Sequence, residues 1–270
     1  MARRPRYQPA LSIVTGASSG IGAAFARALA ARGSDLVLVA RREDRLLALA
    51  RELEQPHGIR CTVAPLDLSR PGAGAALLAV LDSRLDGRVP DLLVNNAGFG
   101  VQGRVADTDP ARLAEEVAVD VAAVVELSRT FVAPMIARGS GAILNIASTA
   151  AYQPVPGMAV YAASKSFVKL FTEALWFEAR PHGVTVFAVA PGAVASEFFD
   201  RGRRIPAPTP YWDPARIADA GLRALDRRRT PPEVMPGLAN RAAAFSTRFI
   251  PRRVLLFFAA RLTATLLAVL

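Results

Sequence analysis

The sequence predicts an α/β fold in which a doubly wound parallel sheet has helices on both faces. Six short apolar runs, rich in β-branched residues, are bounded by turn residues and separated by longer segments with helical spacing. Runs that are apolar throughout are typical of strands buried on both faces, which a parallel sheet requires. The predicted strands are LSIVTG (11–16), DLVLVA (35–40), CTVAPLD (61–67), DLLVNNAG (91–98), GAILNIAS (141–148) and VTVFAVAPG (184–192).

The first two predicted helices directly follow the first two strands. Residues 21–33 have helical spacing and end at Gly33, a residue type that commonly terminates helices. Residues 43–55 place Leu46, Leu49 and Leu53 on one face, opposite charged residues. Strands and helices that alternate in this way form a doubly wound sheet with right-handed crossovers.

The 270 residues are interpreted as one domain, because no internal repeat or low-complexity linker divides them. The predicted α/β domain spans 10–236 and follows a basic extension at 1–9. Within it, residues 193–215 are rich in Pro, Arg and aromatic residues and are expected to form a lid. Residues 237–270 are expected to form an apolar, helical C-terminal tail.

Composition excludes several classes of function. The net charge is +10, but the arginines are scattered among acidic residues, which argues against a nucleic-acid-binding surface. A single cysteine, Cys61, allows neither an internal disulfide nor a cysteine-based metal site. His57 and His182 have no metal-ligand neighbours, so no metal is expected. The basic N-terminus lacks the apolar stretch of a signal peptide, which favours a cytoplasmic protein.

A glycine-rich turn joins the first predicted strand to the first predicted helix. Gly16, Gly20 and Gly22 in VTGASSGIG permit a tight turn and a close approach of the backbone to a pyrophosphate. The turn also directs helix N–H groups and the positive end of the helix at the phosphates. The strand–turn–helix context favours a dinucleotide site over a plain tight turn, which is the alternative.

The end of the second predicted strand bears on the choice of dinucleotide. An enzyme that uses NAD usually places an acidic residue about 20 residues after the turn to hold the ribose 2′-hydroxyl. Here Ala40, Arg41 and Arg42 occupy that place. No carboxylate repels a 2′-phosphate, and a guanidinium can hold one with two hydrogen bonds, so NADP(H) is expected. The alternative for one of the two arginines is that it begins a solvated helix. Asp67 is a candidate acceptor for the adenine amino group.

Taken in order, the motifs resemble those of the short-chain dehydrogenase/reductase family over residues 10–236. They are TGASSGIG (15–22), NNAG (95–98), Ser148, YAASK (161–165) and PGAV (191–194). The resemblance is to single-domain, NADP-preferring members near the ketoacyl and hydroxysteroid reductases. It implies a Rossmann-type sheet of about seven strands, a homodimer or homotetramer, and hydride transfer between a carbonyl and its alcohol.

The resemblance also implies a set of cofactor-binding residues. Pro191 and Gly192 should border the nicotinamide, and Ser196 stands where the family usually has a threonine that binds the carboxamide. The full set is Gly16, Ser18, Ser19, Gly20, Ile21, Gly22, Arg41, Arg42, Asp67, Leu68, Asn95, Ala97, Gly98, Tyr161, Lys165, Pro191, Gly192, Val194 and Ser196.

The choice of lysine at position 165 is unusual, since the chain has 31 arginines and only two lysines, Lys165 and Lys169. Tyr161 and Lys165 are four residues apart, so on a helix they lie on one face. A tyrosine hydroxyl has a pKa near 10, and a nearby ammonium lowers it. An ammonium can also exchange a proton, which a guanidinium cannot. Lys165 is therefore interpreted as functional and Lys169 as a surface residue.

Catalytic roles follow from the resemblance. Tyr161 is the general acid/base, Ser148 anchors the substrate carbonyl, and Lys165 is the electrostatic and relay partner. The family commonly has an asparagine in its long fourth helix, where it anchors a relay water. The matching residue here is Asp120, whose charge would partly cancel the effect of Lys165 on Tyr161. Asp120 is either a fourth catalytic residue or a helix-surface residue.

Segments 149–158 and 193–215 are expected to form the substrate pocket. No carboxylate or histidine is expected to converge there, which favours an apolar ketone, acyl or steroid-like carbonyl over a sugar. The side chains that these segments offer are Tyr152, Val155, Met158, Phe198, Phe199, Tyr211 and Trp212.

The tail and the completeness of the site leave alternatives open. Residues 254–270 carry a single charge, Arg261, but are shorter than the about 20 apolar residues that span a bilayer. They are expected to cover the pocket or join a subunit interface, and second to contact a membrane surface through 251–270. The alternatives for function are a non-catalytic relative, disfavoured because Ser148, Tyr161 and Lys165 are all present, and a membrane-associated lipid or 3-ketoacyl reductase.

Overall fold

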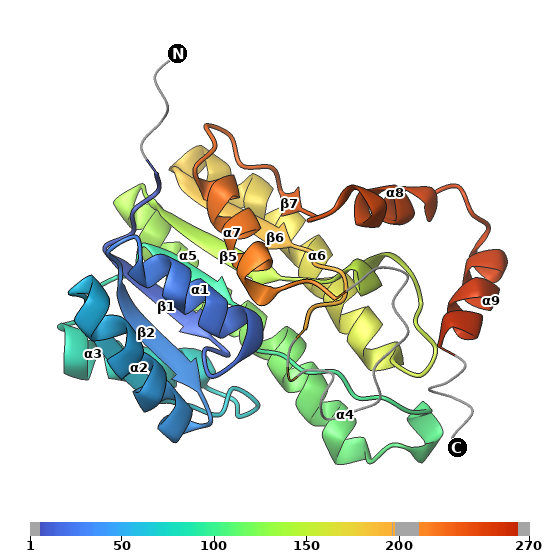
Figure 1. The fold of residues 1–270 in the computed structure, drawn as a ribbon, viewed down its shortest axis with the longest axis horizontal. Coiled ribbons are helices and arrows are strands. Elements are labelled where there is room, and N and C mark those ends of the chain that lie inside the picture. Colours follow the sequence, from blue (N-terminus) through green and yellow to red (C-terminus); the bar gives the residue numbers. More distant parts are fainter. Residues whose placement is uncertain (1–5, 196, 198–210, 264–270) are drawn as a thin grey trace.

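The computed structural model describes residues 6–195, 197 and 211–263. A parallel sheet of seven strands lies between two layers of helices, as the sequence predicts (Figure 1). The strands lie in the order β3-β2-β1-β4-β5-β6-β7. Their bounds are β1 (Leu11–Thr15), β2 (Asp35–Ala40), β3 (Cys61–Pro65), β4 (Leu92–Asn95), β5 (Gly141–Ile146), β6 (Val184–Val189) and β7 (Glu233–Val234).

The helices divide between the two faces of the sheet. Helices α1 (Gly20–Ala30), α2 (Glu43–His57) and α7 (Pro214–Leu225) pack over one face and share a core cluster. Helices α3 (Ala73–Leu85), α5 (Ala123–Arg138) and α6 (Ala159–Ala179) cover the other. Short helical turns lie at η1 (Val105–Asp107), η3 (Thr149–Tyr152) and η4 (Arg180–His182).

The central strands explain where a site can form. In β1, Val14 pairs with Leu38 of β2 on one side and with Val94 of β4 on the other, and all three are fully buried. From β1 the chain first builds outward through β2 and β3, and then crosses to β4 and continues the other way. The loops at the carboxyl ends of β1 and β4 therefore diverge, and this topological switch leaves a crevice where ligands bind in such sheets.

One long helical segment carries an irregular turn that points toward this crevice. Helix α4 (Pro110–Val117) continues into α5 through a π-helical turn, η2 (Ala118–Ala122). Such turns add a residue to the helix and are frequent at functional sites. Asp120 lies in this turn and is fully buried, so it is not the surface residue that one reading of the sequence allowed.

Two further helices follow the sheet. Helix α8 (Leu238–Ser246) leaves the β7 edge, and α9 (Arg252–Leu262) lies beyond it, at the red end of the ribbon (Figure 1). Among the described residues, no helix is both long and apolar enough to cross a membrane. The described residues do not include most of the predicted lid (196 and 198–210) or the end of the tail (264–270). The domain boundaries at 10 and 236 stay predictions.

Candidate active site

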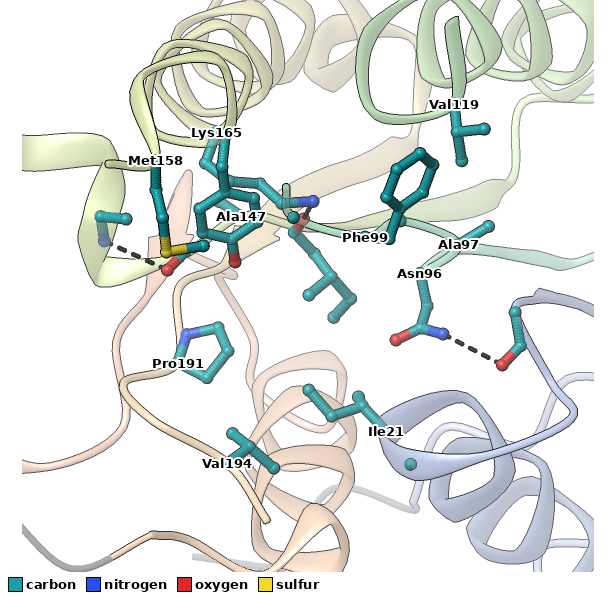
Figure 2. A pocket seen from close by; sticks show the side chains of 18 of the residues that line it. Ile21, Asn96, Ala97, Phe99, Val119, Ala147, Met158, Lys165, Pro191 and Val194 are labelled. Carbon is teal, nitrogen blue, oxygen red and sulfur yellow. Dashed lines mark hydrogen bonds between the residues drawn. The ribbon is translucent and has the colours of Figure 1, made fainter. Parts of the chain in front are cut away.

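A cavity of about 970 Å³ opens at the carboxyl ends of the strands. Its walls come from the glycine turn, the ends of β2, β4, β5 and β6, helix α6, and the two C-terminal helices. Figure 2 shows Lys165, Asn96, Ile21 and Pro191 facing this space from four different segments. The cavity therefore brings together motifs that are far apart in the sequence.

Most of the predicted site residues line this cavity. Three do not: Gly22, Asn95 and Asp120 lie behind its wall, and Ser196 is outside the described residues. The predicted residues that line it are Gly16, Ser18, Ser19, Gly20, Ile21, Arg41, Arg42, Asp67, Leu68, Ala97, Gly98, Ser148, Tyr161, Lys165, Pro191, Gly192 and Val194.

The glycine turn has no room for side chains. Gly16 has a φ of +66°, and a Cβ on Gly22 would lie 2.2 Å from the Gly16 carbonyl oxygen. At the start of α1, the side chain of Ser19 caps no backbone N–H group. The first N–H groups of the helix are thus free to meet an anion, and the turn lets the backbone approach it closely. These observations fit the pyrophosphate of a dinucleotide.

The side chain of Asn95 lies in the interior rather than in the cavity, and its role in cofactor binding stays a prediction. Its side-chain amide donates to Asn145 Oδ1 at 2.9 Å, and the Asn145 amide in turn donates to Thr172 Oγ1 at 2.9 Å. This buried chain joins β4, β5 and α6. The neighbouring Asn96 lines the cavity instead and donates to the Thr15 carbonyl at 2.9 Å, which ties β4 to the glycine turn.

The two arginines after β2 have different surroundings. Arg42 Nη2 donates to the hydroxyls of Ser18 and Ser19 at 2.9 and 3.0 Å. Arg41 points away to Glu115, at 2.9 Å, with half of its side chain exposed. The guanidinium of Arg42 and the two serine hydroxyls therefore form the polar end of the cavity, whereas Arg41 belongs to its rim.

Glu197 also reaches this polar end, a feature that sequence reasoning missed. Its carboxylate accepts from Arg42 Nη1 at 2.8 Å and from Arg45. These hydrogen bonds lower the pKa of Glu197. Glu197 lines the cavity at this polar end, so the expectation that no carboxylate converges on the substrate pocket stays a prediction. Its proximity to Arg42 shows that this guanidinium can bind an anionic group from the lid side.

Helix α6 places Tyr161 and Lys165 on the cavity wall, one turn apart. The Lys165 Nζ atom lies 5.6 Å from the centre of the Tyr161 ring and 3.3 Å from the Ile146 carbonyl oxygen, to which it donates. Ser148 follows β5, and its side chain forms a hydrogen bond with Tyr161. The hydroxyl groups of Ser148 and Tyr161 can thus converge on one carbonyl oxygen.

Asp120 forms a buried ion pair with Lys165. The Lys165 Nζ and Asp120 Oδ2 atoms are 3.0 Å apart, and the Asp120 side chain is 0% exposed. The Phe99 backbone N–H donates to Asp120 Oδ1 at 3.0 Å. A Cβ on Gly98 would lie only 2.8 Å from that oxygen, so glycine at this position leaves room for the pair.

A second buried carboxyl, Glu116, lies one turn before Asp120 and was not predicted. Glu116 Oε1 accepts from the Val101 backbone N–H at 3.3 Å, and its Oε2 has no hydrogen-bond partner among the described residues. Burial, with a smaller contribution from Asp120, raises the pKa of Glu116 to about 7. Its position in a charged, helical stretch gave no signal, because such a stretch is typical of a solvated helix face.

The protonation of the site differs from the expectation in one respect. Burial raises the pKa of Tyr161, and the Lys165 charge and the Ser148 hydrogen bond offset only part of this rise. Burial alone would lower the pKa of Lys165, but the neighbouring Asp120 and Tyr161 raise it overall. Both shifts favour an ammonium at Lys165 and a neutral hydroxyl at Tyr161 near neutral pH.

Lys169 is not the surface residue that the sequence suggested. Its side chain is 13% exposed, and its Nζ donates to Glu173 Oε1 at 2.6 Å. The same ammonium lies 5.2 Å from the centre of the Tyr152 ring, whose hydroxyl donates to Glu233. These residues of α6, η3 and β7 form a second polar cluster, of which Tyr152 lines the cavity and the other three do not.

The far end of the cavity is mostly apolar. Val155 and Met158, predicted for the substrate pocket, line it together with Phe99 and Tyr152 (Figure 2 labels Met158 and Phe99). Trp212 instead packs against the core, and Phe198 and Phe199 lie outside the described residues. The C-terminal helices close this end with Asn240, Ala243, Ala244, Thr247, Ala259 and Thr263.

Comparison with known proteins agrees with this geometry. Residues 11–204 match the family described as short chain dehydrogenase. Sulfoacetaldehyde reductase 2 of Chromohalobacter salexigens is 38% identical, over 69% of this chain and 73% of that protein. Very-long-chain 3-oxoacyl-CoA reductase of Anas platyrhynchos is 31% identical, over 80% and 70%.

A solved structure extends the match to three dimensions. A short-chain dehydrogenase from Sphingobium yanoikuyae in complex with NADPH is 35% identical, with a TM-score of 0.79 over 88% of this chain and 93% of that one. The glycine turn, the uncapped helix and the cavity fit a nicotinamide dinucleotide in the same crevice. The chain belongs to the short-chain dehydrogenase/reductase family and is an oxidoreductase that acts on CH–OH groups with a nicotinamide cofactor.

Proposed function

We propose that the protein is an NADPH-dependent reductase of apolar ketones or acyl carbonyls, with Tyr161 as the general acid. One observation carries the proposal: Tyr161, Ser148 and Lys165 line the same cavity as the glycine turn, and Asp120 holds Lys165 from behind. A fold relative that only binds the cofactor has no need of this arrangement. The function is therefore argued from the side chains rather than from the fold.

The proton chemistry follows from the surroundings of Tyr161. Bound cofactor supplies the hydride. The Ser148 hydroxyl donates a hydrogen bond to the substrate carbonyl oxygen, and the Tyr161 hydroxyl donates its proton to that oxygen as charge develops there. Because burial raises the pKa of Tyr161, the hydroxyl carries its proton at neutral pH, which suits reduction. The Lys165 ammonium then stabilises the phenolate that remains.

The preference for NADPH rests on Arg42. Its guanidinium and the Ser18 and Ser19 hydroxyls meet at the polar end of the cavity, and β2 ends in Ala40 rather than in an acidic residue. We expect the 2′-phosphate to bind there, since a guanidinium and hydroxyl donors match a phosphate group. The NADPH complex of the Sphingobium relative supports this choice.

The apolar far end of the cavity supports the substrate class. Met158, Val155 and the alanines of α8 and α9 offer contact area to a hydrocarbon. Asn240, Thr247 and Thr263 line this end beside them and could hydrogen-bond a polar group at one end of such a substrate. The 3-oxoacyl-CoA reductase among the relatives is a reductase of a carbonyl on a long apolar chain, by its name. The expectation of a cytoplasmic homodimer or homotetramer stays part of the proposal.

A substrate screen tests the proposal. Purified full-length protein is given NADPH and a panel of bulky ketones and 3-oxoacyl thioesters, and loss of NADPH absorbance is followed. We expect turnover with apolar members, little with polyols and sugars, and none with Tyr161→Phe. Tight NADPH binding without turnover of any carbonyl would favour the non-catalytic alternative.

Cofactor choice is tested with two matched variants. Arg42→Ala should weaken NADPH binding about 10-fold or more, the value of a charge-assisted hydrogen bond, and leave NADH binding nearly unchanged. Arg41→Ala should do little to either, because Arg41 pairs with Glu115 at the rim. Affinities come from titration of the free enzyme with each nucleotide. Equal affinities in the wild type, or a larger effect of Arg41, would overturn this assignment.

A further inference from the structure

The C-terminal part of the chain has an unusual charge pattern. Residues 234–270 contain five arginines and neither aspartate nor glutamate, so they carry half of the net charge of +10. Elsewhere in the described part of the chain, many arginines pair with acidic residues. The arginines of this segment are Arg241, Arg248, Arg252, Arg253 and Arg261. A segment with this composition attracts anionic surfaces.

The same segment exposes large apolar side chains. Of the large apolar side chains that are exposed among the described residues, half lie between 238 and 258, although this stretch is short. They include Leu238, 81% exposed, and Phe249, 73% exposed. The others are Phe245, Val254, Leu256, Phe257 and Phe258. Such a concentration of exposed apolar area marks an interaction surface rather than ordinary solvent-facing surface.

Each helix of the segment has one face that is buried against the protein and an opposite face that is exposed. In α8, Ala244 is buried while Phe245 faces outward, and in α9 Leu255 and Ala259 are buried while Phe257 and Phe258 face outward. Arginines lie beside the outer aromatic rings: Arg248 is 5.8 Å from the Phe245 ring centre. Apolar rings and the long stems of arginines together suit the boundary between lipid headgroups and acyl chains.

The inner faces of these helices close the active-site cavity. Ala243 and Thr247 of α8 and its C-terminal turn, and Ala259 of α9, line it, so the cavity wall and the outer apolar surface are two sides of the same helices. A molecule docked on the outer face would lie next to the apolar end of the cavity. Figure 1 shows α8 and α9 beyond the β7 edge, on the side of the molecule away from α1, α2 and α3.

We propose that α8, α9 and the turn between them form a docking surface for a bilayer that contains anionic phospholipids. The helices would lie in the interface plane, since none of the described helices is both long and apolar enough to cross it. A second copy of the chain fits this surface poorly. In a two-fold dimer, the surface of one copy packs against the same surface of the other. The five arginines of one copy would then face the five of the other, and residues 234–270 contain no carboxylate to neutralise them.

Docking has a consequence for substrate access that rests on the proposed function. An apolar carbonyl compound dissolved in the bilayer could enter the cavity along α8 and α9 without crossing water. The docking surface itself does not depend on that function, because its evidence is the charge and exposure of these helices alone. Binding to vesicles and turnover can therefore be measured independently.

Flotation of the full-length protein with vesicles tests the docking surface. We expect binding to vesicles of phosphatidylcholine with phosphatidylglycerol, much weaker binding to phosphatidylcholine alone, and weakening by salt. Arg252→Glu/Arg253→Glu should reduce binding by at least about 20-fold, at roughly fivefold for each arginine. Phe257→Ser/Phe258→Ser should also reduce it.

The matched control is Leu170→Ser/Phe177→Ser on α6. These side chains are 63% and 66% exposed, at least as much as the two phenylalanines of α9, but they lie on α6 and outside the proposed docking surface. We expect this variant to bind vesicles like the wild type. Thermal melting and reduction of a water-soluble ketone show that each variant is folded.

The outcomes separate the two proposals. The docking proposal would be overturned if the wild-type protein bound neither kind of vesicle, or if the tail variants bound as well as the control. A dimer that the tail variants disrupt, without vesicle binding, would assign the surface to a second copy instead. Vesicle binding without turnover of any carbonyl would leave the surface in place and contradict the proposed function.

Discussion

The two lysines of the chain lie one turn apart on α6 and occupy two different environments. Both are largely buried, with side chains 6% and 13% exposed, and both pair with a carboxylate. Lys165 lines the cavity, and its partner Asp120 is fully buried behind it. Lys169 pairs with the partly exposed Glu173 on its own helix and lies over the Tyr152 ring.

The difference shows that burial alone does not identify the functional lysine. The Lys165 cluster can contact a substrate in the cavity, because Lys165, Tyr161 and Ser148 all line it. The Lys169 cluster is closed, since the Tyr152 hydroxyl already donates to Glu233 of β7. We therefore expect the first cluster to govern proton transfer and the second to hold η3, α6 and β7 together.

The largest expected effect separates two tyrosines that both line the cavity. Tyr161→Phe removes the proposed proton donor and should lower turnover by about 1,000-fold, within the usual range for general acid catalysis. Tyr152→Phe removes only a hydrogen bond to Glu233, so it should cost about 1–3 kcal/mol of stability and change turnover little. Steady-state kinetics and urea unfolding measure the two effects. Similar turnover in both variants would contradict the division into two clusters.

A smaller effect concerns the charge of Asp120. The Asp120 carboxylate helps to raise the pKa of Tyr161, so Asp120→Asn should lower it. Reduction requires protonated Tyr161, and the alkaline limb of its pH–rate profile should then move to lower pH while activity near neutral pH is kept. Glu173→Gln, which removes the partner of Lys169, should leave the profile in place. An unmoved limb in Asp120→Asn would mean that Asp120 is not coupled to Tyr161.

Glu116 should affect stability more than turnover. Its pKa is raised from 4.5 to about 7 by burial, so the folded protein binds a proton there more tightly than the unfolded chain does. Stability from this group is full below pH 4.5 and falls as the pH rises to about 7, by up to about 3 kcal/mol. Glu116→Gln should flatten this fall between pH 5 and pH 8, measured by urea unfolding. If the free energy of unfolding changed equally with pH in the wild type and in Glu116→Gln, Glu116 would not be the group that titrates in this range.

The fold and the cofactor end of the site could be predicted because local sequence determines them. Continuous apolar runs specify strands buried on both faces. The glycine turn depends on a backbone conformation and a close packing that only glycine permits at positions 16 and 22. Tyr161 and Lys165 needed only the helical period to be placed on one face. Each of these inferences depends on residues close together in the chain.

The remaining features depend on contacts that no local pattern encodes. Glu116 lies in a charged helical stretch that is typical of a solvated face, yet its side chain is fully buried just before the π-helical turn at 118–122. Lys169 is covered by Tyr152, a residue from another element. Glu197 meets Arg42 across 155 positions of sequence, and a pairing at that separation leaves no periodic trace.

The most direct test of the account is the turnover of Lys165→Arg measured beside Lys169→Arg. The two changes are chemically identical and lie one turn apart on α6. At 165, the larger, forked guanidinium cannot exchange a proton and would disturb the buried pair with Asp120, so turnover should fall about 100-fold or more. At 169, arginine can keep both the pair with Glu173 and the contact with Tyr152, so turnover should stay close to that of the wild type. Comparable turnover in the two variants would contradict the claim that Lys165 belongs to the catalytic machinery and Lys169 does not.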